Sequence, residues 1–223
     1  RGIGDSQRGG GPLTCASLAA DAAAVLVALD VPSAHVLGWS LGSAVAQELA
    51  LAAASRVDSL VLWGTWPALD GFQACGLAAL RHPWTTGDVS VGLATLGLAF
   101  SPELLNAPEF GLVMAQQLPY LPSTKTQVSA VGEQWAAIIA HNSADRLAGI
   151  TAPTLVIGGE QDLLTPVWQC RRVAELIPGA MLKVFTGPGS SHAVGLERPE
   201  EFLAEVLKFL AGQGHPGGPA AAG

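Results

Sequence analysis

The chain has 223 residues and a formal net charge of −7, without a cluster of lysine and arginine. This length is enough for one domain with a substantial core. With 49% hydrophobic and 13% charged residues, the composition is typical of a globular chain and excludes a disordered one. The acidic balance disfavours nucleic acid and anionic membrane surfaces as partners. No apolar run is long and uncharged enough to predict a membrane span.

The cysteines are odd in number and widely spaced, at Cys15, Cys75 and Cys170. They fit neither a disulfide framework nor a metal-ligand pattern, so we expect no metal site. Their simplest role is as small buried hydrophobic residues. A chain without a disulfide pattern is typical of a reducing compartment, and we expect a cytoplasmic protein.

Helices and strands alternate in the first part of the chain. Residues 1–13 are rich in glycine and predict a loop, and residues 16–29 carry apolar side chains at helical spacing. The short apolar run 35–38 predicts a buried strand. Helical spacing returns over residues 41–54, and residues 59–63 predict a second buried strand.

The same alternation returns near the end of the chain. Residues 154–157 and 181–185 predict two further strands. Between them, residues 166–176 have the pattern of a helix, with Thr165 as its N-cap and a proline in its first turn. A last amphipathic helix is expected over residues 199–211.

This order of elements predicts an α/β fold with a mostly parallel sheet. The strands are too apolar to face water, so we expect helices on both faces of the sheet. Residues 68–150 contain several helical patterns without a clear strand, which predicts an inserted helical lid. The core then comprises residues 1–67 and 151–212, and residues 213–223 are expected to form a disordered tail.

The segment Gly-Trp-Ser-Leu-Gly at residues 38–42 matches the pattern G-x-S-x-G. It lies where a predicted strand ends and a predicted helix begins, the setting in which a sharp turn exposes a nucleophilic serine. We expect the turn to require residues without side chains two positions before and after Ser40. The helix start favours developing negative charge, and the Leu41 amide can donate to an oxyanion. The alternative is a plain turn with a capping serine.

A serine hydroxyl needs a base that accepts its proton. His192 follows the strand predicted at residues 181–185, in a loop at the carboxyl edge of the sheet, where catalytic groups of open α/β sheets collect. We therefore predict His192 as the base; the alternative is an ordinary loop histidine. The remaining histidines fall in a strand, in the lid or in the tail: His35, His82, His141 and His215.

The imidazole needs an acid that fixes its tautomer and stabilises its charged form. Asp162 and Glu160 both follow the strand predicted at residues 154–157, and Asp70 follows the second strand. Asp162 lies further beyond the strand end, where it can turn towards the histidine loop, and is the favoured candidate. Glu160 and Asp70 remain alternatives. The order serine, acid, histidine is the one associated with this type of turn.

Several stretches together resemble the α/β-hydrolase fold superfamily, in its branch of lidded serine esterases, enol-lactonases and haloperoxidase-like enzymes. They are residues 1–6, the serine turn at 38–43, the acid strand at 152–162, and the histidine loop with the last helix at 192–202. The resemblance spans nearly the whole chain in the right order. It implies the α/β-hydrolase fold and chemistry without a cofactor.

The chain departs from this family pattern in two places. Ser43 stands where a glycine is usual, and its small side chain should still permit close packing of strand and helix. In the family, the loop matched by residues 1–6 follows four strands and one helix, which include a His-Gly segment that supplies a second oxyanion amide. The resemblance therefore implies an N-terminally truncated domain with an open sheet edge. A missing oxyanion donor costs about 10²–10³ in rate.

A serine nucleophile implies acyl chemistry on a small-molecule carboxylic ester or lactone. The lid contributes many apolar side chains and few charges, which favours an apolar substrate, and Trp39 and Trp135 are our candidates for substrate contacts. The alternative is that Trp39 only wedges the serine turn and that the lid aromatics only pack within the lid. The alternative hypothesis is a hydrolase-like fragment or binding module without catalysis, because half of the oxyanion hole has no counterpart here. The other apolar candidates in the lid are Phe72, Trp84, Phe100, Leu104, Leu105 and Phe110.

Overall fold

The computed structural model describes residues 1–117, 119 and 121–213. Within these residues the protein has one parallel sheet of four strands in the order β1-β2-β3-β4. The strands are β1 (Ala34–Trp39), β2 (Val57–Trp63), β3 (Thr154–Gly159) and β4 (Met181–Phe185). The predicted α/β class and all four predicted strands are confirmed, with boundaries shifted by two residues or fewer.

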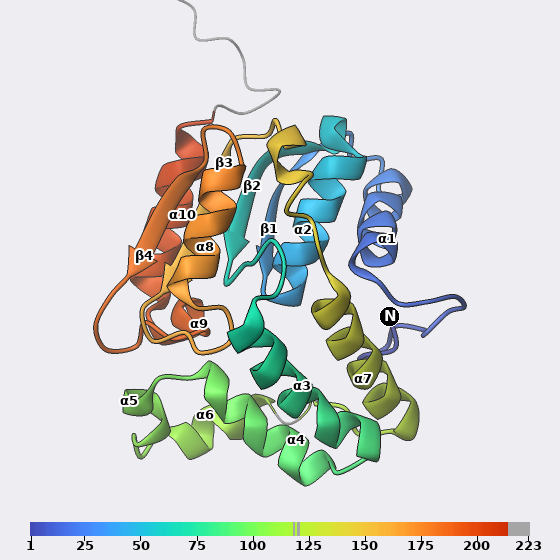
Figure 1. The fold of residues 1–223 in the computed structure, drawn as a ribbon, viewed down its shortest axis with the longest axis vertical. Coiled ribbons are helices and arrows are strands. Elements are labelled where there is room, and N and C mark those ends of the chain that lie inside the picture. Colours follow the sequence, from blue (N-terminus) through green and yellow to red (C-terminus); the bar gives the residue numbers. More distant parts are fainter. Residues whose placement is uncertain (118, 120, 214–223) are drawn as a thin grey trace, which may run out of the picture.

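One face of the sheet is covered by helices that the sequence predicted. Helix α2 (Leu41–Ala52) packs against β1 and β2, and α8 (Val167–Leu176) packs against β3 and β4. Helix α1 (Cys15–Ala28) lies outside α2 (Figure 1). Apolar side chains of these elements form one buried cluster, which includes Leu49, Leu60, Leu62, Val156 and Val173.

The opposite face is covered by α10 (Pro199–Ala211), which follows the short helix α9 (Val194–Glu197). Three apolar residues of α10 pack on the side chains that β2, β3 and β4 direct to this face: Phe202, Val206 and Phe209. Cover is less complete on the outermost strand, because Leu37 of β1 keeps 48% of its surface exposed. The prediction of helices on both faces of the sheet is confirmed.

Residues 68–150 enter the domain between β2 and β3, and the described part is helical. In Figure 1, the strands point towards helices α3 to α6, and α7 returns the chain to the sheet. We call residues 68–150 the helical insertion. Its helices are α3 (Gly71–Thr86), α4 (Val89–Thr95), α5 (Pro102–Leu105), α6 (Phe110–Gln117) and α7 (Lys125–Ala140). Short 3₁₀ turns lie at η1 (Ala54–Arg56), η2 (Leu96–Ala99) and η4 (Leu147–Gly149).

The two long helices of the insertion begin at strong capping residues. The Asp70 carboxylate accepts from the amide of Gln73 at 2.9 Å, and Thr124 forms a capping box with Gln127. These contacts satisfy amides that the first turn of a helix leaves without partners. Helix α3 ends at Gly87, whose φ of +79° is the left-handed conformation that glycine adopts without strain.

The start of α8 differs from the sequence prediction. Helix α8 begins at Val167 and its N-cap position is Pro166, so the predicted N-cap role of Thr165 is wrong. The Thr165 hydroxyl is instead hydrogen-bonded to Asp162, as described below. The predicted disordered tail falls mostly on residues 214–223, which lie outside the described residues. Among the described residues, no helix combines the length and the apolar character needed to cross a bilayer.

Candidate active site

Ser40 occupies a strained turn between β1 and α2. Its backbone has φ 53° and ψ −121°, a positive φ that a residue with a side chain rarely adopts. The turn brings the helix backbone against the strand, because a Cβ placed on Gly38 would lie 2.2 Å from the carbonyl oxygen of Gly42. A Cβ on Gly42 would meet nothing within 4 Å. The steric need for glycine therefore holds at position 38 and was wrong at position 42.

Hydrogen bonds hold this turn in place. The Ser40 amide donates to the carbonyl of Trp63 on β2 at 2.9 Å, and the Ser40 carbonyl accepts from the amide of Ser43 at 2.8 Å. The Ser43 hydroxyl donates to the same carbonyl at 2.7 Å and is fully buried. A small residue at position 43 thus permits the close packing expected there. Strain at a functional turn persists when its surroundings fix it in this way.

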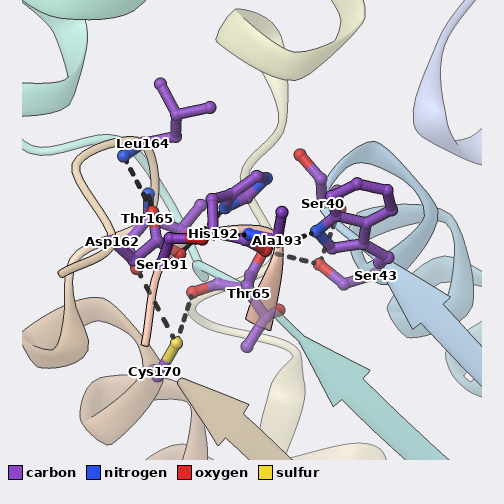
Figure 2. A network of polar contacts seen from close by, with 12 residues as sticks. Ser40, Ser43, Thr65, Asp162, Leu164, Thr165, Cys170, Ser191, His192 and Ala193 are labelled. Atoms are coloured by element: carbon purple, nitrogen blue, oxygen red, sulfur yellow. Dashed lines mark hydrogen bonds and ion pairs between the residues drawn. The ribbon is translucent and has the colours of Figure 1, made fainter. Parts of the chain in front are cut away.

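His192 and Asp162 form a buried pair at the carboxyl edge of the sheet. The Nδ1 atom of His192 lies 2.8 Å from Oδ2 of Asp162, and both side chains are almost completely buried. A carboxylate at Nδ1 requires that this nitrogen carry the proton, which leaves the lone pair of Nε2 free to accept another. In Figure 2, His192 lies between Asp162 and Thr165 on one side and Ser40 on the other.

Thr165 contributes to this pair although the sequence reasoning gave it a different role. Its hydroxyl donates to Oδ2 of Asp162 at 2.6 Å and lies 3.1 Å from Nδ1 of His192. Gly64, at the end of β2, leaves space for the imidazole, since a Cβ there would lie 2.9 Å from Cε1 of His192. Neither role has a local sequence signal, because both depend on the packing of three separate loops.

Trp39 connects the serine turn to the histidine loop. Its indole Nε1 donates to the backbone carbonyl of His192 at 3.0 Å. The ring stacks on Trp63 with centroids 4.5 Å apart, and its centroid lies 5.6 Å from that of His192. The indole therefore has fixed partners on both sides. Such contacts restrain the backbone that carries the imidazole.

The other candidate acids and bases have different partners. Asp70 caps α3 and accepts from the indole of Trp168 at 2.7 Å, while Glu160 accepts from the amide of Gly187 at 3.0 Å. Among the three candidate acids, Asp162 is the one whose carboxylate contacts His192. Nδ1 of His35 is hydrogen-bonded to the hydroxyl of Ser59 at 2.8 Å. His82 is exposed, His141 lies buried at the end of α7, and His215 lies outside the described residues.

A cavity of about 340 Å³ lies between the serine turn and the helical insertion. Its lining includes five residues predicted for the site: Trp39, Ser40, Leu41, Trp135 and His192. Leu41 is the first residue of α2, where helical amides have no partner within the helix. Of the other apolar insertion residues that we considered, Trp84 lines this cavity, whereas Phe72 packs on Trp168 and Phe100 on Phe110.

The sequence reasoning also missed a polar residue of the cavity wall. Gln134 of α7 lines the cavity and forms no hydrogen bond with the residues that the structure describes. No group of three or more histidine, cysteine, aspartate and glutamate side chains within the described residues is arranged to hold a metal ion.

Comparison with known proteins establishes the family of this α/β protein. A model of the alpha/beta hydrolase fold family matches residues 1–199. The chain belongs to this family and is a hydrolase of the α/β fold.

Individual relatives cover most of the chain. A putative carbamate hydrolase RutD from Azorhizobium caulinodans is 31% identical over 93% of this chain and 77% of its own length. A pimeloyl-(acyl-carrier protein) methyl ester esterase from Chromobacterium violaceum is 29% identical over 87% of this chain and 77% of its own. The crystal structure of an enol-lactonase from Burkholderia xenovorans LB400 matches with a TM-score of 0.81 and 25% identity, over 95% of this chain and 78% of that one.

Proposed function

We propose that this chain hydrolyses a carboxylic ester or lactone, with Ser40 as nucleophile, His192 as general base and Asp162 as the acid that orients the base. The observation that carries the proposal is the pair of His192 and Asp162, 2.8 Å apart, at a cavity that Ser40 also lines. The strained backbone of Ser40 is a second support, since such strain clusters at catalytic turns.

In the first half of the reaction, Oγ of Ser40 attacks the carbonyl carbon while Nε2 of His192 takes the hydroxyl proton. The carbonyl oxygen becomes an oxyanion, which accepts a hydrogen bond from the Leu41 amide. Asp162 stabilises the imidazolium that forms. Collapse of the intermediate breaks the bond to the alcohol oxygen, and His192 returns its proton to that oxygen.

In the second half, water hydrolyses the acyl-serine. Nε2 of His192 removes a proton from the water as its oxygen attacks the acyl carbon, and a second oxyanion forms at the same position. Its collapse releases the carboxylic acid, and the proton on His192 returns to Oγ of Ser40. A lactone follows the same steps, but its alcohol and acid stay within one molecule.

The cavity walls favour an apolar acyl group with one polar substituent. Trp39, Trp135 and Trp84 supply aromatic surface, and Gln134 offers an amide for a second oxygen or nitrogen of the substrate. An ester and a lactone appear in the names of two relatives, the Chromobacterium esterase and the Burkholderia enol-lactonase. Their similarity to this chain supports the proposed substrate class.

A reducing compartment such as the cytoplasm belongs to the same proposal. All three cysteines are free thiols. Burial raises the pKa of Cys15 and of Cys170 to about 12, so both side chains stay protonated and unreactive at neutral pH. These two act as small core residues, as the sequence predicted, whereas Cys75 is exposed.

The test is hydrolysis of p-nitrophenyl esters of short and medium acyl chains by the purified protein and by Ser40→Ala. We expect measurable turnover by the wild type. In Ser40→Ala the rate should fall by about 10³-fold or more, because the covalent pathway needs Oγ. Ser129→Ala is the matched control, since Ser129 is an exposed serine of α7.

Covalent labelling with a fluorophosphonate probe gives a second readout. The wild type and Ser129→Ala should be labelled at Ser40, and Ser40→Ala should stay unlabelled. Equal ester hydrolysis by wild type and Ser40→Ala, without labelling of Ser40, would contradict the proposed function. That result would favour the hydrolase-like module without catalysis.

A further inference from the structure

We propose that Glu197 is a positioning residue that fastens the helical insertion to the loop carrying His192. Glu197 ends α9, five residues after the histidine. Its carboxylate contacts Ser101 on the insertion and Ser191 on the histidine loop. We call this group of three residues the carboxylate clamp.

The clamp consists of three hydrogen bonds to one side chain. Oε1 of Glu197 accepts from the Ser101 amide at 2.9 Å and from the Ser191 hydroxyl at 2.5 Å. Oε2 accepts from the Ser101 hydroxyl. Both serines are at most 1% exposed, so their donors have no access to water as an alternative partner. A buried donor that loses its acceptor is costly, which makes the carboxylate hard to replace.

A backbone contact joins the same two segments. The amide of Ala193 donates to the carbonyl of Ala99 at 2.9 Å and also to the hydroxyl oxygen of Ser191 at 3.0 Å. Ala99 ends the 3₁₀ turn η2, two residues before Ser101. The insertion is thus attached on both sides of His192 in the sequence, through Ser191 and through Ala193.

The clamp lies beside the wall of the cavity that His192 lines. Ala99 and Leu96 of the insertion line the cavity together with His192. The clamp therefore fixes one wall of the cavity relative to the base. A carboxylate suits this position because it is an acceptor only, and all three of its partners are donors. An alanine at position 197 would free η2 and the histidine loop to move independently.

The inference rests on the proposed function and predicts a specific kinetic effect. In Glu197→Ala, kcat/KM for p-nitrophenyl esters should fall about 10- to 100-fold, the cost of small misplacements of catalytic groups. The fall should include a rise in KM, because the cavity wall moves with η2. Glu197→Gln keeps an acceptor for the Ser101 amide and the Ser191 hydroxyl but leaves the Ser101 hydroxyl without one, so its kcat/KM should fall by a smaller factor than that of Glu197→Ala.

Glu200→Ala is the matched control, since Glu200 is an exposed glutamate in the first turn of α10. It should leave kcat and KM within about twofold of wild type. Ser101→Ala removes one hydroxyl and repeats the test with a smaller change, which guards against misfolding of Glu197→Ala. Its kcat/KM should fall in the same direction by a smaller factor.

Amide hydrogen exchange of the full chain measures the clamp without reference to catalysis. In Glu197→Ala, the amides of Ser101 and Ala193 should exchange faster, while amides of β2 and β3 keep their wild-type rates. If exchange is faster in Glu197→Ala but the wild type hydrolyses no ester, the clamp stands and the proposed function is rejected. Unchanged kinetics and unchanged exchange in Glu197→Ala, with Ser40→Ala inactive, would reject the clamp and keep the function.

Discussion

Besides its contact with His192, the carboxylate of Asp162 accepts three further hydrogen bonds. The amides of Leu164 and Thr165 both donate to Oδ1 at 2.8 Å, and the Thr165 hydroxyl donates to Oδ2 at 2.6 Å. A buried carboxylate is costly unless donors compensate for its lost hydration. These donors fix the orientation of the carboxylate, and the carboxylate in turn fixes the imidazole of His192.

The hydroxyl of Thr165 can be tested by a pair of substitutions. Thr165→Val keeps the shape of the side chain and removes the donor, so kcat/KM for a p-nitrophenyl ester should fall about 10-fold, as expected for a hydrogen bond to a charged group. Thr165→Ser restores the hydroxyl and should recover most of the activity. Equal losses in both variants would contradict a role specific to the hydroxyl of Thr165.

The two glycines around Ser40 should differ sharply in tolerance. Gly38→Ala places a Cβ 2.2 Å from the backbone of Gly42 and should lower the free energy of unfolding by about 3 kcal/mol or more. Gly42→Ala meets no atom within 4 Å, so its free energy of unfolding should stay within about 1 kcal/mol of wild type. Urea denaturation measures both. Similar losses in the two variants would contradict the steric argument.

At the scale of elements, α2 is joined to the end of the insertion by buried polar groups. The Gln47 amide donates to the Thr65 hydroxyl at 2.7 Å and accepts from the Ser143 hydroxyl at 2.6 Å and from Nε2 of His141 at 3.1 Å. Beside them, Glu48 binds Arg146 through two hydrogen bonds of 2.6 and 2.8 Å. The helix after Ser40 is therefore fixed to the segment that follows α7.

His141 makes this contact sensitive to pH. Burial lowers the pKa of His141 from 6.5 to about 4, and the charge of Glu48 only partly opposes this effect. The unfolded chain thus binds more protons than the folded protein between these values. The contribution of His141 to the free energy of unfolding is therefore complete above pH 6.5 and is lost as the pH falls towards 4.

The measurement is urea unfolding at pH 7 and pH 5. The contribution of His141 to the free energy of unfolding should fall by about 2 kcal/mol over this interval. His141→Asn cannot titrate, so its free energy of unfolding should change less than that of wild type by this amount. Parallel changes in the two proteins would show that other groups account for the pH dependence.

At the scale of the whole molecule, β1 is the outermost strand of the sheet that the described residues form. It pairs with β2 along one edge, and no described residue continues the sheet along the other. Leu37 is half exposed on this strand. An unpaired strand with apolar side chains is a template for association with another chain.

For a polypeptide of residues 1–223 alone, we expect self-association at this edge, measurable by sedimentation velocity over a range of protein concentrations. Leu37→Lys should reduce the associated fraction, because a charged side chain on an edge strand opposes pairing. Leu207→Lys is the matched control, since Leu207 of α10 is similarly exposed at 54% and lies away from β1. Equal effects of the two substitutions would indicate a general effect of charge and reject the edge as the contact.

Much of the fold follows from short-range patterns. Apolar runs of strand length and helical spacing identified β1 to β4 and the helices α1, α2, α8 and α10, because period and length are properties of the local sequence. The G-x-S-x-G pattern between a strand and a helix located the turn of Ser40. The position of His192 after β4 brought it to the same edge, since parallel strands end on one side of a sheet.

The sequence already favoured Asp162 by its position beyond the strand end, but tertiary structure decided which candidate acid contacts His192 and which residues support it. Asp162 and Glu160 follow the same strand with the same chemistry, and only the path of the loop brings one of them to His192. The same loop turns the hydroxyl of Thr165 from the helix cap to the carboxylate. Glu197 and Ser101 lie 96 residues apart in the chain, so no local pattern could have paired them. The sequence alone determined which residue types stand at the sheet edge, whereas packing of distant segments determined which of them touch.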